Sequence, residues 1–242
     1  MVIDEKIVDK SDICMLSQRQ IKILETIIRE YIKRAEPIGS EESLWKKLDV
    51  SSATIRNEMK ELEDAGFLSQ PHTSAGRAPT LKGYKYFIDN LMKECALNAE
   101  ERKVLGRKNH GVDFEEGTKQ QAKALAQLTF EAVILTFGKD NFYYTGLTNI
   151  FSKPEFRESG NIISLSEVLD ELDEAVQKLF NEELLSAKIL IGSKSPFGAS
   201  CGVIAGLYKK NGKEGILAVF GPIRMDYERN ISLLNCVLDA LN

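Results

Sequence analysis

One helix-sized segment near the N-terminus carries side chains whose types suit the recognition of DNA bases and phosphates. It begins at Ser51 and reads SSATIRNEMKELED. Arg56 can pair with O6 and N7 of guanine, and Asn57 with N6 and N7 of adenine. The hydroxyls of Ser51, Ser52 and Thr54 can bind phosphate beside the free N–H groups of a helix start. These residues predict a helix that reads the major groove, with a solvated helix face as the alternative for Arg56 and Asn57.

A loop shortly after this segment supplies a second group of candidate contacts. The loop, PHTSAGR at 71–77, places Arg77 among small residues. Small side chains let a backbone approach DNA, and an arginine suits a narrow minor groove, although an ordinary surface turn is the alternative. The predicted DNA contacts are Ser51, Ser52, Thr54, Arg56, Asn57, Lys60, His72, Thr73, Ser74, Gly76, Arg77 and Lys82. His72 has a structural alternative, and a solvated helix face is the favoured reading of Lys82 and of Lys85, as single exposed lysines.

The elements around these residues follow the order of a winged helix-turn-helix. Apolar residues at three- and four-residue steps predict a helix over 17–34, which Pro37 and Gly39 end. A short helix over 41–48 comes next, followed by the groove-reading helix to about Asp64, with Ile55, Met59 and Leu62 as its buried stripe. The wing is predicted as a strand over 67–70 and a return over 78–80. A fourth helix starting at Thr80 or Leu81 buries Tyr84, Phe87, Ile88 and Leu91.

The C-terminal half has the pattern of an α+β domain. Strands are predicted over 131–137, 141–145, 187–191, 202–208 and 215–220. Helices are predicted over 114–129, 162–180 and 226–241, the last capped by Asp226. The chain is therefore interpreted as a flexible arm at 1–15, a winged-helix DNA-binding domain at 16–93, a linker and helix at 94–129, and an α+β domain at 130–242. Most of 94–112 is expected to be linker, with a helical piece at 99–107.

Composition limits the class of protein. The chain has 242 residues, 43% of them apolar, without an apolar run long enough for a membrane span or an N-terminal signal peptide. Its four cysteines are far apart, which favours reduced thiols in the cytoplasm over a disulfide framework or a zinc site. Net charge is −4, yet residues 16–93 hold 13 Lys and Arg against 11 Asp and Glu. This small positive excess matters for DNA only if it is concentrated on one face.

Several segments resemble one known family. The runs SSATIRNEM, QPHTSAGR and KGY, with EYIKRAEPIGSEES upstream, are similar to the winged-helix segment of the heat-inducible transcription repressor family, HrcA. Further on, TGLTNI at 145–150 and KPEF at 153–156 resemble the "GL.N...PEF" element of that family. GPIRMDY at 221–227 resembles its "GP.RMDY" element. The chain looks like a shortened member that lacks part of the central region.

This resemblance implies a fold and a function. It implies a homodimeric repressor of chaperone operons that binds an inverted-repeat operator, CIRCE. The C-terminal domain would be GAF-like, and the chaperonin GroEL would be a protein partner that tunes activity. A dimer also agrees with recognition physics, because one winged helix makes few base contacts and a two-fold dimer matches a palindrome. The candidate dimer surfaces are the helix at 114–129 and the closing helix with Leu233, Leu234, Val237 and Leu241, although domain core is the favoured reading of these leucines.

Three other functions remain as alternatives. A regulator of other genes could sense a small ligand in its C-terminal domain, with Ser193, Ser195, Ser200 and Cys201 as candidate lining; a glycine-rich strand connection is favoured. An enzyme is disfavoured because the only histidines are His72 and His110, and catalytic motifs are absent. A pure protein-interaction module conflicts with the arginine in the wing. No cofactor or metal is predicted, and Arg224 is expected to pair with a carboxylate inside the domain.

Overall fold

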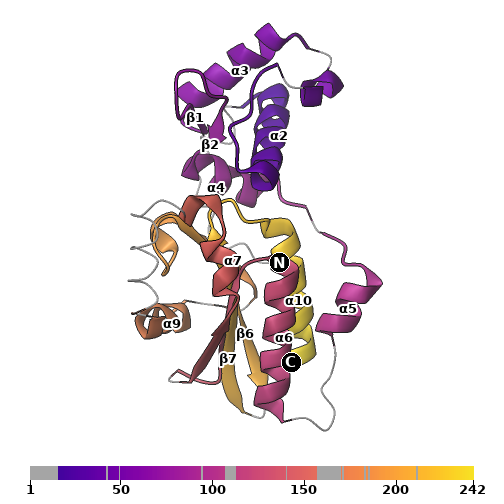
Figure 1. Cartoon of the computed structure of the whole chain (residues 1–242), viewed down its shortest axis with the longest axis vertical. Coiled ribbons are helices and arrows are strands. Elements are labelled where there is room, and N and C mark those ends of the chain that lie inside the picture. The colour runs from indigo at the N-terminus through magenta and orange to yellow at the C-terminus, as the bar shows by residue number, and fades with distance from the viewer. Residues whose placement is uncertain are drawn as a thin grey trace. The chain divides into compact units, whose positions relative to one another are not determined.

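The chain divides into two compact units between Met92 and Lys93 (Figure 1). The computed structural model describes residues 16–41, 43–48, 50–93, 95–106, 113–139, 141–156, 170, 172–182, 184, 186–210 and 212–242. The predicted arm at 1–15, His110 and the first part of the predicted helix at 162–180 lie outside these residues. Among the described helices, none combines the length and the apolar character needed to cross a membrane.

The N-terminal unit begins with the long helix α2, Gln18–Arg34. A capping box between Ser17 and Gln20 starts it, and Ala35 ends it in the left-handed conformation at φ 56°. The predicted second helix is a 3₁₀ helix, η1, Ser43–Leu48. It lies within the short helix predicted over 41–48, and a 3₁₀ coil is common for helical pieces of this length. Trp45 anchors this coil, since its indole N–H donates to the carbonyl of Gly39 at 2.7 Å.

Helix α3, Ser52–Asp64, is the predicted groove-reading helix. The short wing strands β1, Leu68–Ser69, and β2, Ala78–Pro79, pair antiparallel. Helix α4, Leu81–Asn90, follows, with the Thr80 hydroxyl accepting from the N–H of Gly83 at 3.1 Å. The core of this unit includes Ile23, Leu24, Ile27, Ile28, Ile38, Trp45, Ile55, Met59, Leu62, Phe67, Leu68, Ala78, Tyr84, Tyr86, Phe87 and Ile88. The predicted inward stripes of α3 and α4 are thus confirmed, except that Leu91 is only half-buried.

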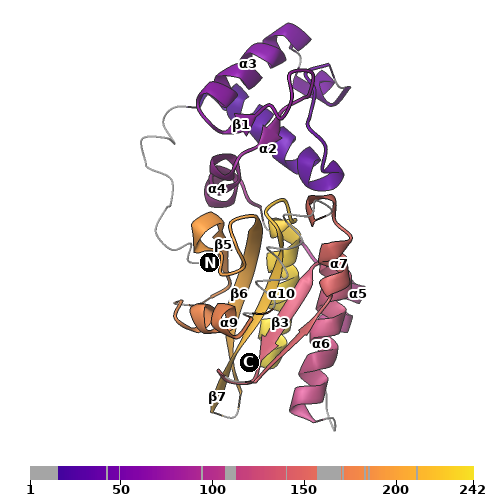
Figure 2. The ribbon, with the colours of Figure 1, turned by 60° about the vertical axis from the view of Figure 1, so that its left-hand side comes forward.

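The C-terminal unit is built on a five-stranded antiparallel sheet in the order β4-β3-β7-β6-β5 (Figure 2). Its strands are β3 (Ala132–Thr136), β4 (Phe142–Thr145), β5 (Lys188–Ile191), β6 (Cys201–Lys210) and β7 (Lys213–Pro222). All five were predicted, but β6 and β7 are longer than expected. Their ten-residue ladder from Cys201↔Pro222 to Lys210↔Lys213 forms the centre of the sheet.

Helices cover both faces of this sheet. Helices α6, Phe114–Thr129, and α10, Tyr227–Leu241, pack on one face. On the other face lie α7 (Leu147–Phe151), the 3₁₀ helix η2 (Pro154–Phe156) and α9 (Leu172–Phe180), whose apolar side chains join a single buried cluster with the sheet. A further 3₁₀ turn, η3 (Gly192–Lys194), follows β5. Asp226 caps α10 as predicted, and Leu233, Leu234, Val237 and Leu241 are core residues.

The segment predicted to be mostly linker contains a docked helix. Helix α5, Ala99–Leu105, starts with a capping box between Asn98 and Glu101. Glu101 also pairs with Arg229 of α10 at 2.7 Å, and Leu105 is fully buried. The backbone N–H of Lys93 donates to Glu228. The segment therefore belongs to the C-terminal unit, and Glu101 joins it to α10 by an ion pair.

Candidate nucleic-acid interface

Local capping and an apolar stripe set the orientation of α3. The Ser51 hydroxyl accepts from the N–H of Thr54 at 3.1 Å and lies 3.0 Å from the Thr54 hydroxyl. Ile55, Met59 and Leu62 are buried, which turns the opposite side of the helix to solvent. The exposed side carries Ser52, Ala53, Arg56, Asn57, Lys60, Glu61 and Asp64. The predicted base-reading pair, Arg56 and Asn57, is therefore accessible.

Two polar contacts hold α3 on α2. Arg19 pairs with Glu58 at 3.1 Å, and the amide of Gln20 donates to Glu61 at 2.7 Å. Both carboxylates belong to α3, so the contacts complement the buried stripe. Helix α3 is thus held in place by its buried stripe and by these polar contacts to α2.

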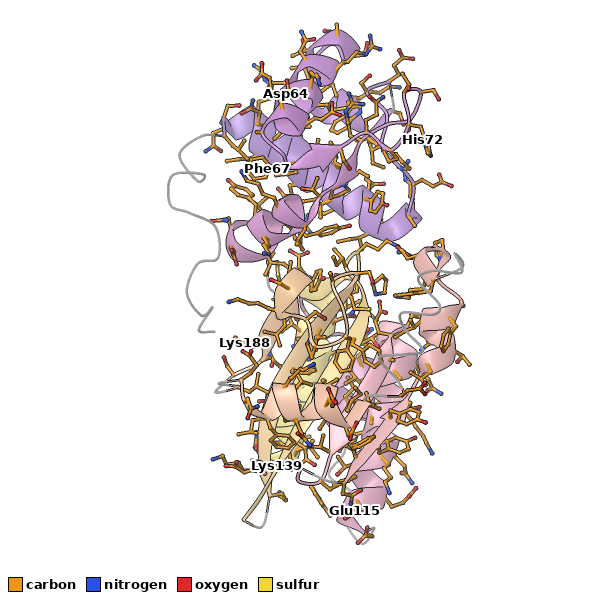
Figure 3. The ribbon with its side chains drawn as sticks, turned by 90° about the vertical axis from the view of Figure 1, so that its left-hand side faces the viewer. Asp64, Phe67, His72, Glu115, Lys139 and Lys188 are labelled. Carbon is orange, nitrogen blue, oxygen red and sulfur yellow. The ribbon has the colours of Figure 1, made fainter. Side chains whose placement is uncertain are left out.

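The wing gains a third strand-like segment from the turn after α2. Ile38 and Arg77 form an antiparallel bridge, in which each N–H donates to the other carbonyl at 2.9 Å. Beyond it, the amide of Gln70 donates to the carbonyls of Thr73 and Ala75, both at 2.9 Å. The loop is closed by its own backbone and by one amide. Its tip leaves Pro71, His72, Thr73 and Ser74 exposed, and Figure 3 labels His72 on this loop and Asp64 on α3.

Gly76 makes the close approach between the wing and this turn possible. A β-carbon at this position would collide with the backbone of Ile38 and the N atom of Gly39. The predicted reason for small residues in the loop was approach to DNA. The described contact shows that at least one of them is required by packing within the protein.

The cationic side chains predicted to contact DNA are engaged with acceptors of the protein itself. Arg56 pairs with Glu41 at 3.0 Å, with the two side chains 62% and 77% exposed. Lys60 lies 3.0 Å from Asp64 and 3.4 Å from Glu63, and the hydrogen bond to Asp64 raises the pKa of Lys60. Lys82 donates to the carbonyl of Ala65 at 3.3 Å and lies over the ring of Phe67. Binding to phosphate therefore requires exchange of partners.

Arg77 differs from these exposed cations. It pairs with Glu63 of α3 at 3.0 Å, and its side chain is only 14% exposed. The turn at 38–41, α3 and the wing enclose a hollow of about 410 Å³, and Arg56, Arg77 and Glu41 contribute to its lining. Sequence reasoning missed the carboxylates Glu41 and Glu63, because their partners are distant in sequence.

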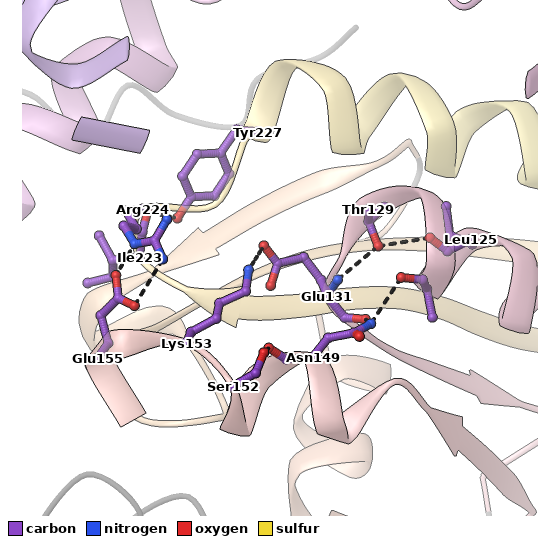
Figure 4. A network of polar contacts seen from close by, with 11 residues as sticks. Leu125, Thr129, Glu131, Asn149, Ser152, Lys153, Glu155, Ile223, Arg224 and Tyr227 are labelled. Atoms are coloured by element: carbon purple, nitrogen blue, oxygen red, sulfur yellow. Dashed lines mark hydrogen bonds and ion pairs between the residues drawn. The ribbon is translucent and has the colours of Figure 1, made fainter. Parts of the chain in front are cut away.

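The C-terminal unit contains a charge cluster, in which Glu131 is buried and the other members are half-buried, that joins the two family-like elements (Figure 4). Glu131, at the start of β3, pairs with Lys153, and the side chain of Glu131 is 3% exposed. Glu155 of η2 pairs with Arg224, the residue predicted to find an internal carboxylate. Asn149 donates to the carbonyls of Ala126 and Glu131, both at 3.1 Å. The PEF and RMDY segments thus meet at one end of the sheet.

The environment of Glu131 is unusual for a carboxylate. Burial raises the pKa of Glu131 to about 7, although Lys153 and Arg224 lower it. Its second carboxylate oxygen is buried without a hydrogen-bond partner. Gly221 leaves the space that this carboxylate fills. Sequence reasoning missed Glu131; the available signal was a charged residue heading an apolar strand.

The residues suggested as a ligand-pocket lining do not share one environment. Ser195 and Cys201 are buried, whereas Ser193 and Ser200 are exposed. Phe197 of the same connection stacks on Phe220 with ring centroids 4.6 Å apart. This connection packs against the core, in agreement with the structural interpretation of its sequence.

Comparison with known proteins identifies the family of both units. The family model "Winged helix-turn-helix transcription repressor, HrcA DNA-binding" matches residues 15–92. The family model "HrcA protein C terminal domain" matches residues 86–231, which is more than half of the chain. Both units therefore match models of the same family.

Curated relatives carry the same family name. A protein of Natranaerobius thermophilus, "Heat-inducible transcription repressor HrcA", is 49% identical over 118 residues, which cover 47% of this chain and 34% of the relative. A protein of Brevibacillus brevis with that name is 27% identical over 334 residues, which cover 94% of this chain and 97% of the relative. Because the second alignment spans more positions than the 242 residues of this chain, that relative contains segments that this chain lacks.

A solved structure has the same fold. The "Crystal structure of a hypothetical protein at 2.2 A resolution" superposes with a TM-score of 0.78 and covers 93% of this chain and 97% of that one, at 22% identity. This likeness concerns the fold alone, whereas the two family models identify the sequence, and they describe a repressor, not an enzyme. The chain therefore belongs to the HrcA family of winged helix-turn-helix transcription repressors.

Proposed function

We propose that this chain represses heat-shock genes in the cytoplasm by binding, as a homodimer, an inverted-repeat operator of the CIRCE type. The name shared by the curated relatives supports the stress-related targets. The family resemblance supports the operator type and makes the chaperonin GroEL the expected protein partner. A small-ligand sensor gains no specific support from the serine-rich connection after β5.

The observation that carries this proposal is the exposed pair Arg56 and Asn57 on α3, beside a wing of fixed geometry. The major groove is about 12 Å wide and admits one helix, whose N-terminal residues meet the base edges. Both residues lie within the first two turns of α3, which starts at Ser52. The buried stripe and the contacts to α2 hold these side chains outward, so they suit direct base readout.

The remaining contacts in the proposal have separate roles. Ser51 and Ser52 lie at the helix start, where free N–H groups and hydroxyls suit a phosphate. Thr54 supports this site through its hydrogen bond with Ser51. Lys60 and Lys82 approach phosphates once they leave their internal acceptors. The exposed loop residues His72, Thr73 and Ser74 contact the sugar-phosphate backbone of the DNA next to the groove that α3 enters.

The homodimer in the proposal rests on recognition physics. Specific binding at about 10⁻⁸ M or tighter needs more contacts than one winged helix supplies. A two-fold dimer places a recognition helix in each half of an inverted repeat.

Fluorescence anisotropy on two duplexes tests this function. The full-length protein is titrated at physiological salt with a labelled CIRCE-type inverted repeat and with a scrambled duplex of equal composition. We expect a preference of about 10³-fold or more for the repeat. Arg56→Ala and Asn57→Ala should each reduce this preference by about 1–3 kcal/mol. Each should do so mainly by weakening binding to the inverted repeat, with little change in binding to the scrambled duplex. Equal affinity of the unaltered protein for both duplexes would contradict the proposal.

A further inference from the structure

We propose that Arg77 is a positioning residue that braces the wing against the recognition helix through Glu63, rather than a residue that reads the minor groove. This inference rests on the proposed function, because it assigns a role within the same DNA interface. It reverses the interpretation that the loop sequence suggests.

The first argument is the environment of the guanidinium group. Arg77 lies 3.0 Å from Glu63, and the side chains are 14% and 22% exposed. Arg56, on the same face, is 62% exposed. An arginine that inserts into a minor groove must extend from the protein surface. Arg77 would have to leave a half-buried carboxylate before it could do so.

The second argument is that the backbone of Arg77 is anchored as well. Its N–H and C=O groups form the two-hydrogen-bond bridge to Ile38, and the preceding Gly76 lies directly against the backbone of Ile38 and Gly39. The main chain of Arg77 is thus fixed to the turn after α2, and its side chain is fixed to the end of α3. A residue held at both ends sets the separation between the wing loop and α3.

This separation matters for recognition. The position of the loop determines where the exposed residues Thr73 and Ser74 lie, and the position of α3 determines where Arg56 and Asn57 lie. Recognition groups need to be held to within about 0.5 Å by their supporting contacts. A loosened brace would leave each contact residue intact and still misplace one group relative to the other.

The sign of the effect of Glu63→Gln on operator affinity separates the two roles. If Arg77 reads DNA, loss of the Glu63 charge frees the arginine and removes a negative charge near phosphates, so affinity rises. If Arg77 is a brace, Glu63→Gln loosens the wing, and we expect operator affinity to fall by about three- to tenfold. Glu25→Gln is the matched control, because it makes the same charge change at a similarly half-buried carboxylate, 21% exposed, whose partner Arg29 lies on the same helix, α2. Unchanged or higher operator affinity in Glu63→Gln would overturn the brace.

Arg77→Gln and the double variant give a second readout. A brace predicts that the double variant binds no more weakly than Arg77→Gln alone, since both changes remove one contact. It also predicts an unchanged slope of log affinity against log salt for Arg77→Gln. Loss of a phosphate contact would instead flatten the slope by about 0.9. A flatter salt-dependence slope for Arg77→Gln would overturn the brace. So would a loss of operator affinity in the double variant equal to the sum of the two single losses.

A third measurement needs no DNA and separates failure of the brace from failure of the proposed function. Hydrogen exchange at the backbone amides of residues 38 and 77 should accelerate in Glu63→Gln and Arg77→Gln, but not in Glu25→Gln. Unchanged exchange in the first two variants would overturn the brace even if the protein binds its operator. Equal binding of operator and scrambled DNA by the unaltered protein, with accelerated exchange in the variants, would overturn only the proposed function.

Discussion

At the scale of single residues, the carboxylates beside the cations proposed to contact DNA determine how easily those cations could leave the protein surface. Arg56 is both an exposed candidate reader and the partner of Glu41 at 3.0 Å. Because both side chains are largely exposed, the ion pair is weak and easily exchanged. In the proposed interface, Glu41 would therefore be a mild competitor of DNA for Arg56, in contrast to the half-buried Glu63, which holds Arg77.

Glu41→Gln is expected to raise affinity for operator and scrambled DNA alike, by no more than about fivefold. The reason is that the free protein then no longer holds Arg56 in an ion pair. Anisotropy titrations of both duplexes measure the effect. The same substitution in an Arg56→Ala background is the control and should have no effect. An equal gain in that background would mean that Glu41 acts only through its long-range charge.

Glu131 makes a separate residue-scale prediction, on the pH dependence of stability. Its pKa in the folded protein is about 7, raised from an ordinary 4.5. A raised carboxyl pKa means that the folded state binds the proton more tightly than the unfolded state. The stabilisation is complete below pH 4.5 and is lost as pH rises through 7. Over this window the loss is of the order of 3 kcal/mol.

Denaturant unfolding of the unaltered protein and of Glu131→Gln, followed in the C-terminal unit from pH 4 to 8, tests this expectation. As pH rises from 4.5 to 7, the unaltered protein should lose unfolding free energy relative to Glu131→Gln. Glu101→Gln is the matched control, since the hydrogen bond from the N–H of Asn98 lowers the pKa of Glu101. For Glu101→Gln, the difference in unfolding free energy from the unaltered protein should change only below pH 4.5 and stay constant between pH 4.5 and 7. A difference for Glu131→Gln that does not vary with pH would contradict a buried titrating carboxyl.

At the scale of elements, the sequence predicted most helices and strands because each follows a short-range rule. The caps at Ser51, Thr80 and Asp226 and the buried stripe of α3 were readable from periodicity and residue type. Helix α5 agrees with the helical piece predicted at 99–107. Its docking on the C-terminal unit was not predicted, because it comes from burial of Leu105 and from the pair of Glu101 with Arg229, which is remote in sequence.

The candidate interface shows the same division. The exposure of Arg56 and Asn57 follows from their places relative to the buried stripe, so the sequence predicted it. The environment of Arg77 depends on Glu63 and Ile38, whose proximity no local pattern encodes. Likewise, the cluster of Glu131, Lys153 and Arg224 exists only once three separate segments meet at the end of the sheet.

The wing as an element depends on its approach to the turn after α2. Gly76→Ala should destabilise the N-terminal unit by about 1–3 kcal/mol, because the added methyl group collides with the backbone of Ile38. Thermal unfolding of that unit measures the loss. Ser74→Ala, at an exposed site in the same loop, should leave the unfolding temperature unchanged. An equally stable Gly76→Ala variant would show that the wing can move away from the turn at little cost.

At the scale of the whole molecule, bulk charge cannot supply the affinity for DNA. The net charge is −4, and the N-terminal region at 16–93 has only two more basic than acidic residues. The exposed cations of α3 also pair with carboxylates of their own surface. Non-specific binding, which depends on neutralised phosphates, should therefore be weak. The proposed dimer would gain affinity chiefly by placing two correctly spaced sets of contacts on one site.

Two-fold recognition predicts a steep dependence on the geometry of the operator. A duplex with both half-sites should bind at least about 100-fold more tightly than a duplex with one, because the second half-site is reached within the same complex. Insertion of about 5 base pairs, half a helical turn, between the half-sites turns them to opposite faces and should reduce affinity to that of one half-site. Insertion of a full turn of about 10 base pairs is the control for added length and should restore part of the affinity. Anisotropy on these four duplexes, with sedimentation to give the stoichiometry, measures the effect. Equal affinity for all four would mean that the chain binds as a monomer to one half-site.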